Sequence, residues 1–180
     1  MKKELVISGF GGQGGLAIGK NLAEAGMAEG LNVTWAPSYG PEMRGGTANC
    51  SVVLSDSPIG SPVFAHPSDL IALNEPSLVK FEADVVPGGL VLVNSDVITR
   101  EVNRSDVTSY YIPCSTIAEE LGNPKVANMV MLGAYIGATQ ALKPDTLKEM
   151  IRHKFSGPKA HLIDINLQAL EAGLSCGRTE

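Results

Sequence analysis

The chain has 180 residues, of which 14 are Lys or Arg and 19 are Asp or Glu, so its formal net charge at pH 7 is −5. The few basic residues are scattered, which argues against binding to nucleic acid, because duplex-binding proteins neutralise phosphates with clustered Lys and Arg. A hydrophobic fraction of 44% and a charged fraction of 18% exclude a disordered chain and predict one globular domain over residues 1–180.

The first part of the chain has the order strand, glycine-rich turn, helix, strand. Residues 5–8 form a short apolar run, and apolar residues then recur at helical spacing over 16–27. Residues 32–35 predict a second strand, and the right-handed crossover between the two strands predicts that they run parallel. We expect a long irregular loop at 36–46.

The remainder of the chain predicts further strands and then mostly helices. Segments rich in β-branched and apolar residues predict strands at 47–54, 69–73, 89–94 and 110–113. Helices are predicted at 76–82, 116–121, 125–142, 144–155 and 167–174. Together these segments predict an α/β fold, with a single open, mostly parallel sheet, flanking helices and a helix-rich C-terminal third.

Cysteine spacing and the apolar segments bear on where the protein works. Cys50, Cys114 and Cys176 are far apart and predict neither a disulfide framework nor a metal or iron–sulfur site. No signal-peptide pattern follows the first residues. The uncharged stretch 126–142 contains polar residues and falls short of the ~20 apolar residues that a membrane span needs, so it predicts a buried helix. We therefore expect a cytoplasmic protein without a membrane contact.

A glycine-rich motif follows the first predicted strand, where GFGGQG fits the GxGxxG pattern directly before a helix. The glycines allow a tight turn, and the helix N-terminus offers backbone N–H groups to an anion. NAD is not expected, because the second strand ends at Trp35, Ala36 and Pro37 where an acidic residue would bind the ribose. Three interpretations of the loop follow: it packs against a partner chain, it holds a phosphate-bearing ligand or another anion, or its glycines are purely structural. Its candidate residues are Gly9, Gly11, Gly12, Gln13 and Gly14.

A second motif, SYGPEMRGG, follows the second strand, at the edge of the sheet where ligands bind in such folds. Arg44 presents a planar fork that suits phosphate or carboxylate, and Glu42 can hold this fork in place. The alternative is a surface turn with an Arg–Glu pair that contributes ~1 kcal/mol or less. The candidate residues are Ser38, Tyr39, Gly40, Pro41, Glu42, Arg44, Gly45 and Gly46.

With these two loops the sequence resembles the gamma subunit, or fused gamma domain, of 2-oxoacid:ferredoxin oxidoreductases. The likeness covers most of the chain and continues through 47–54, 71–74, 87–89, 117–122 and 125–129. It departs at Gly15, where the family usually carries Val or another branched residue.

The resemblance implies a complex of anaerobic metabolism that decarboxylates a 2-oxoacid on thiamine diphosphate, passes electrons through iron–sulfur clusters to ferredoxin and releases an acyl-CoA. Thiamine diphosphate, Mg and the clusters are then expected on other chains, with no catalytic residue, metal or cofactor on this one. The implied partners are the alpha, beta and ferredoxin-like delta subunits, and the isolated chain is expected to be inactive. The two loops are expected to face the catalytic subunits or coenzyme A, and 2-oxoglutarate or branched-chain oxoacids are slightly favoured as substrates.

Two other functions fit parts of the sequence. A stand-alone nucleotide-binding oxidoreductase would use the GxGxxG turn, although the missing acidic residue counts against it. A structural homodimer would use Gly133 and Gly137, whose spacing lets another helix approach closely, although this spacing more often marks internal packing in a soluble chain.

Overall fold

The computed structural model describes residues 1–38 and 47–178. The chain divides into two compact units, Met1–Ile112 and Pro113–Glu180. A single domain over residues 1–180 stays a prediction.

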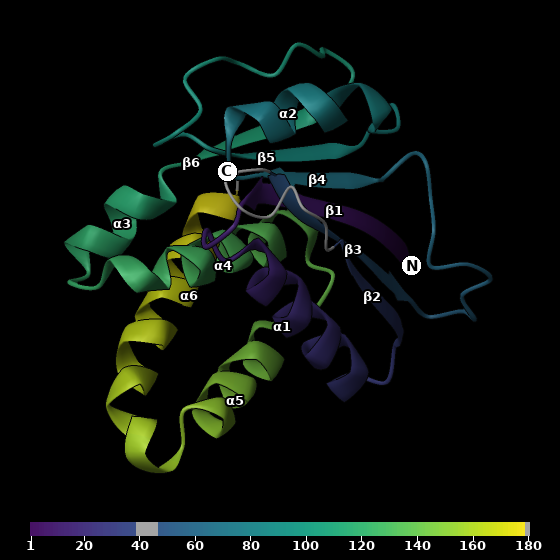
Figure 1. Cartoon of the computed structure of the whole chain (residues 1–180). Coiled ribbons are helices and arrows are strands. Elements are labelled where there is room, and N and C mark those ends of the chain that lie inside the picture. The colour runs from purple at the N-terminus through teal and green to yellow at the C-terminus, as the bar shows by residue number, and fades with distance from the viewer. Residues whose placement is uncertain (39–46, 179–180) are drawn as a thin grey trace. The chain divides into compact units, whose positions relative to one another are not determined.

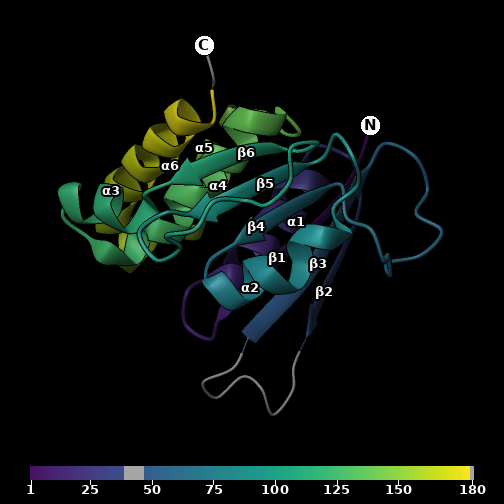
Figure 2. The same ribbon diagram turned by 90° about the horizontal axis from the view of Figure 1, so that it is seen from above.

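The first unit is a six-stranded sheet with α1 on one face and α2 on the other (Figure 1, Figure 2). Its elements are β1 (Lys2–Phe10), α1 (Gly15–Ala28), β2 (Asn32–Ser38), β3 (Thr47–Ser55), β4 (Asp69–Ala72), α2 (Glu75–Phe81), the 3₁₀ turn η2 (Glu82–Asp84), β5 (Leu90–Asn94) and β6 (Thr108–Ile112). The strand order is β2-β3-β1-β4-β5-β6. The pairs β1–β4, β4–β5 and β5–β6 are parallel, whereas β3 is antiparallel to both of its neighbours, β1 and β2. The predicted mostly parallel α/β sheet is confirmed.

The structure corrects two details at β2. This strand runs in the same direction as β1, as predicted, but β3 lies between them because it pairs with both. The strand also continues through residues 36–38, which were expected to begin a loop. Pro37 is compatible with this extension because β2 is an edge strand, where a missing N–H leaves no ladder hydrogen bond unmade on the open side.

The centre of the sheet is apolar on both faces. Every residue of β4 and β5 is buried, which is the pattern of parallel strands covered by helices on both sides. On the face under α2, Leu78 packs into a cluster with Val6, Leu70 and Val91. At ~1.5–3 kcal/mol for each fully buried large aliphatic side chain, this burial is the main favourable term for the unit.

Over its described residues, 113–178, the second unit has helices and no strand, which confirms the helix-rich C-terminal third. Its elements are α3 (Cys114–Glu120), the 3₁₀ turn η3 (Pro124–Val126), α4 (Ala127–Thr139), α5 (Pro144–Lys154), the 3₁₀ turn η4 (Gly157–Leu162) and α6 (Ile163–Gly177). Residues 129–137 of α4 are all buried, as predicted for this apolar stretch. Among the residues that the structure describes, no helix is long and apolar enough to cross a membrane.

Helices α4 and α6 pack backbone against backbone through reciprocal glycines. A Cβ on Gly137 would lie 2.5 Å from the carbonyl oxygen of Leu174, and a Cβ on Gly173 would collide with the carbonyl oxygen of Val130. Gly133 likewise faces the backbone of α6. The spacing that suggested a homodimer therefore serves packing within the chain, and the homodimer hypothesis loses its sequence support.

Candidate functional site

Strand pairing brings the ends of both sequence motifs to one edge of the sheet. Phe10 in the glycine motif pairs with Thr47, the residue directly after the second motif, and Ser38, the first residue of that motif, pairs with Asn49. The glycine loop therefore starts at the end of β1, and the second motif starts on β2 and is followed by β3, so the two motifs adjoin three neighbouring strands although about thirty residues separate them in the sequence. Seven candidates lie outside the described residues: Tyr39, Gly40, Pro41, Glu42, Arg44, Gly45 and Gly46.

The glycine loop turns through backbone conformations that favour glycine. Gly12 and Gly14 have φ angles of 91° and 85°, in the left-handed region. Gly14 is also the residue that precedes α1, and it has no side chain to cap the helix. The first backbone N–H groups of a helix have no intrahelical partner, so this end of α1 can donate hydrogen bonds to an anion or to a partner chain.

The side chain of Gln13 ties the loop to the neighbouring strands. Its Oε1 accepts a hydrogen bond from the backbone N–H of Phe10 at 2.6 Å, and its Nε2 donates to the carbonyl oxygen of Leu73 at 3.0 Å. Gly9 leaves room for this amide, since a Cβ there would lie 2.6 Å from Oε1. Both the oxygen and the nitrogen of the Gln13 amide therefore have hydrogen-bond partners within the chain, and these two bonds hold the loop in position relative to the sheet.

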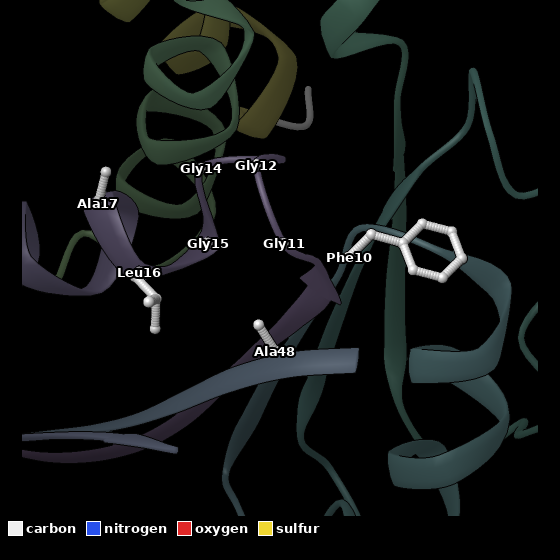
Figure 3. A pocket seen from close by; sticks show the side chains of 8 residues that line it. All are labelled: Phe10, Gly11, Gly12, Gly14, Gly15, Leu16, Ala17 and Ala48. Carbon is white, nitrogen blue, oxygen red and sulfur yellow. The ribbon is translucent and has the colours of Figure 1, made fainter. Parts of the chain in front are cut away.

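A hollow of about 290 Å³ lies against the loop. Glycine backbone and small or apolar side chains line it, as Figure 3 shows: Phe10, Gly11, Gly12, Gly14, Gly15, Leu16, Ala17 and Ala48. The ring of Phe10 extends away from the loop and is 43% exposed. No carboxylate lines the hollow, so its described walls can accept an apolar group or an anion without charge repulsion.

A buried polar cluster lies beside the loop and was missed by the sequence reasoning. The hydroxyls of Ser8 and Ser77 are 2.8 Å apart, and Asn74 Oδ1 accepts from the backbone N–H of Ser77 at 2.9 Å. The chain leaves β1 toward β2 and leaves β4 toward β5, so this cluster marks the point where the strand order reverses, and ligands of open α/β sheets bind at such points. Asn74 followed by Glu75 and Pro76 is a helix N-cap signal that could have found it.

The Cys50 thiol beneath the loop is unreactive. Burial raises the pKa of the Cys50 thiol to about 12. Its Sγ lies 3.6 Å from the carbonyl oxygen of Gly15, beneath the start of α1. At neutral pH this thiol is protonated and a poor nucleophile. Within 1–38 and 47–178, no three His, Cys, Asp or Glu side chains are grouped so that they could hold a metal ion. The chemistry that the described loop supports is binding.

The sheet is an open α/β sheet with a glycine loop at its strand-order reversal, the place at the carboxyl edge where ligands bind in this class of fold. The model of the pyruvate ferredoxin/flavodoxin oxidoreductase family matches residues 4–176, and the chain belongs to this family. The resemblance carried by the two loops is confirmed.

Relatives with established names cover most of the chain. It is 43% identical to ketoisovalerate oxidoreductase subunit VorA of Methanothermobacter thermautotrophicus, over 96% of this chain and 36% of that protein. It is 40% identical to 2-oxoglutarate synthase subunit KorC of Methanocaldococcus jannaschii, over 84% of this chain and 82% of that protein. The chain therefore spans about a third of the length of VorA but most of the length of KorC.

Solved structures share the fold. The gamma subunit of a keto/oxoacid ferredoxin oxidoreductase from Geobacter sulfurreducens matches with a TM-score of 0.82 and 29% identity, over 97% of this chain and 98% of that one. The 2-oxoglutarate:ferredoxin oxidoreductase from Magnetococcus marinus, with 2-oxoglutarate, coenzyme A and succinyl-CoA bound, matches with a TM-score of 0.88 and 25% identity, over 98% of this chain and 31% of that one.

Proposed function

We propose that this chain is the gamma component of a 2-oxoacid:ferredoxin oxidoreductase, a complex that oxidatively decarboxylates a 2-oxoacid to an acyl-CoA and reduces ferredoxin. Family membership and the names of the relatives support this function. The observation that carries it is the pairing of Phe10 with Thr47 and of Ser38 with Asn49, because it brings the ends of both motif loops to one edge of the sheet. Its partners are alpha, beta and ferredoxin-like delta subunits in the cytoplasm.

Thiamine diphosphate, Mg and the iron–sulfur clusters belong, in this proposal, to the other chains. Clusters are held by cysteine thiolates. The cysteines of this chain do not fit that role: Cys50 and Cys114 are buried, and the raised pKa of Cys50 keeps it a thiol. This chain contributes an interface, so the isolated protein is colourless and inactive.

The interface surrounds the glycine loop and the second motif. The N–H groups at the start of α1 and the guanidinium of Arg44 suit the phosphates of coenzyme A, and the apolar hollow beside Gly12 suits an uncharged part of a ligand or a partner backbone. Partner carboxylates would suit the same donors. The substrate that we propose is 2-oxoglutarate or a branched-chain oxoacid, the acids named for the relatives.

A pair of glycine variants tests the interface. Gly12 and Gly30 both have positive φ angles, 91° and 80°, and a Cβ at either meets no atom within 4 Å. Gly12→Val and Gly30→Val therefore carry similar backbone strain of ~1–3 kcal/mol, but only Gly12 lies on the proposed interface. Co-purification with the alpha, beta and delta chains should fall for Gly12→Val and persist for Gly30→Val. Equal assembly of both variants would contradict the proposed interface.

Arg44→Lys separates the two occupants of that interface. Lysine keeps the charge but loses the bidentate fork. If Arg44 binds coenzyme A, the KM for coenzyme A rises in the assembled complex while assembly and the KM for the 2-oxoacid stay unchanged. If Arg44 pairs with a partner carboxylate, assembly weakens by ~1–3 kcal/mol instead. No change in either quantity would leave the second loop as a surface turn.

A further inference from the structure

Strand β2 forms one edge of the six-stranded sheet, and none of its seven residues is fully buried. Soluble proteins protect edge strands from pairing with other chains by charged side chains, Pro, bulges, short length or a covering segment. Strand β2 has no charged residue, and its register with β3 is unbroken from Asn32 to Ser38. Pro37 is the one such protective residue among the seven. Over residues 32–36, β2 is therefore an edge that another strand can join.

The hydrogen bonds of the sheet show which residues of β2 direct their backbone groups to the open side. The N–H of Leu73 donates to the carbonyl oxygen of Ser8, so Ser8 points toward β4 and the preceding Ile7 points toward β3. Cys50 on β3 pairs with Ile7 and directs its backbone toward β1, so its other partner, Pro37, points away from β3. The open side thus carries the backbone groups of every second residue of β2, counted from Pro37.

Two residues on the open side offer both a donor and an acceptor to a new strand. Val33 and Trp35 lie four and two residues before Pro37, and each directs an N–H and a carbonyl oxygen outward. Within residues 32–38, an antiparallel second copy can bond all of these groups only if Val33 of one copy pairs with Trp35 of the other. Thr34 then lies on the two-fold axis, opposite the same residue of the second copy, and Pro37 lies outside the paired stretch.

Thr34 suits this position on the axis. Its hydroxyl oxygen is buried and has no hydrogen-bond partner in the part of the chain that the structure describes. Opposed residues of a non-hydrogen-bonded antiparallel pair have Cα atoms about 4.5 Å apart, and opposed Thr side chains form hydroxyl hydrogen bonds. A second copy supplies the partner that this hydroxyl lacks. The uncharged strand also suits a second copy, because a charge on the axis would face the same charge.

We propose that β2 is an interaction surface for a second copy of this chain, paired antiparallel so that two six-stranded sheets become one continuous sheet. The inference does not depend on the proposed function, and its surface is distinct from the glycines that pack α4 against α6. A pairing over residues 32–36 is smaller than a standard interface, so the dimer is weak and depends on protein concentration. Each copy has a net charge of −5, so dimerisation should strengthen as the ionic strength rises to 0.15 M, where the Debye length is about 8 Å.

A disulfide placed on the two-fold axis tests this register. In Thr34→Cys the two new thiols oppose each other at a Cα separation that a disulfide allows. The control is Ala36→Cys, at an exposed position on the same face of β2, whose two copies would lie about 13 Å apart along the strands. Both variants also carry Cys176→Ser, because Cys176 is partly exposed whereas the other native cysteines are buried. After mild oxidation, non-reducing electrophoresis should show about tenfold more covalent dimer for Thr34→Cys. Equal cross-linking of the two variants would refute the proposed register.

Sedimentation of the full chain tests the dimer without a cross-link. Thr34→Lys brings two cations together on the axis and should abolish the dimer, whereas Thr108→Lys, at an exposed position of the other edge strand, should leave it unchanged. A wild-type chain that stays monomeric at every concentration would refute the proposal, as would a Thr34→Lys chain that still dimerises. Protection of the Val33 and Trp35 amides from hydrogen exchange only in the presence of other subunits would assign the edge to one of them and overturn the proposal.

Discussion

Replacing Gly9 with Ala should destabilise the first unit by displacing Gln13. A Cβ at Gly9 would lie 2.6 Å from Gln13 Oε1 and 2.7 Å from Leu73 Cβ, closer than unbonded atoms approach. Leu73 is buried beside the sheet and cannot move aside freely. The Gln13 amide must therefore leave its position between the N–H of Phe10 and the carbonyl of Leu73.

The size of the effect follows from the contacts that are lost. Two hydrogen bonds at ~0.5–1.5 kcal/mol each give a loss of ~1–3 kcal/mol. The Gly to Ala change also reduces the entropy of the unfolded chain, which returns ~0.4–1 kcal/mol. Displacement of Gln13 does not relieve the 2.7 Å contact with Leu73 Cβ, which adds an overpacking cost of ~1–3 kcal/mol, so the expected net loss in the free energy of unfolding is ~1–5 kcal/mol.

Gly15→Ala is the matched control, six residues along the chain. Its Cβ would lie 3.4 Å from Ile7 Cγ2 and Leu73 Cδ1, an ordinary contact, and it sits in α1, where Ala is favoured over Gly by ~0.5–1 kcal/mol. Urea unfolding followed by fluorescence of Trp35, the single Trp of the chain, measures both variants. With a slope of ~1–3 kcal/mol/M, the two midpoints should differ by ~1 M. A Gly9→Ala midpoint equal to or above that of Gly15→Ala would refute the role assigned to Gln13.

Three further predictions follow from other contacts. Gly173→Ala should lower the free energy of unfolding of the helical unit by ~3 kcal/mol, because the new Cβ meets the backbone of α4. The control Gln168→Ala, at an exposed position of the same helix, should stay within ~0.5 kcal/mol of the wild type in the same calorimetric scan. Burial raises the pKa of Cys50 to about 12, so Cys50 should resist Ellman's reagent at pH 8 until the chain unfolds, while the partly buried Cys176 reacts first; early labelling of Cys50 would contradict its burial. Because the thiol of the unfolded chain ionises near 9.0, the free energy of unfolding should fall as the pH rises from 9 toward 12. The hydrogen bond from Arg104 lowers the pKa of Asp106 below 3.8, so the stability that this bond adds is present above that pH and is lost on acidification. In Asp106→Asn the urea midpoint should therefore decrease less than in the wild type as the pH falls below about 5. An equal decrease in both proteins would argue against the ion pair.

The sequence predicts the elements better than their arrangement. The apolar runs that become β4 and β5 and the periodic segments that become α4 and α5 are local signals, so their types follow from short stretches of sequence. The insertion of β3 between β1 and β2 depends on pairing between distant residues, which no local pattern encodes.

In the candidate site, too, the local backbone turn can be predicted from the sequence and the contacts between distant residues cannot. The glycine loop is visible as a motif because its spacing reports the backbone turn that Gly12 and Gly14 adopt. The hydrogen bonds of Gln13 are not visible, since Leu73 is sixty residues away in the chain. The partner of Gly133 and Gly137 could have been found, because Gly173 and Gly177 repeat the same spacing on α6.

The central place of β1 has a consequence for synthesis on the ribosome. Its two neighbours in the sheet, β3 and β4, are translated later, and β4 is complete only at Ala72, 62 residues after the end of β1. At ~5–20 residues per second this interval lasts ~3–12 s. The apolar run Leu5, Val6 and Ile7 therefore leaves the ribosome with both edges unpaired. Of the six strands, β1 has the longest interval between its own synthesis and that of its last partner, so it is the strand whose unpaired edges stay open to a nascent-chain chaperone for the longest time.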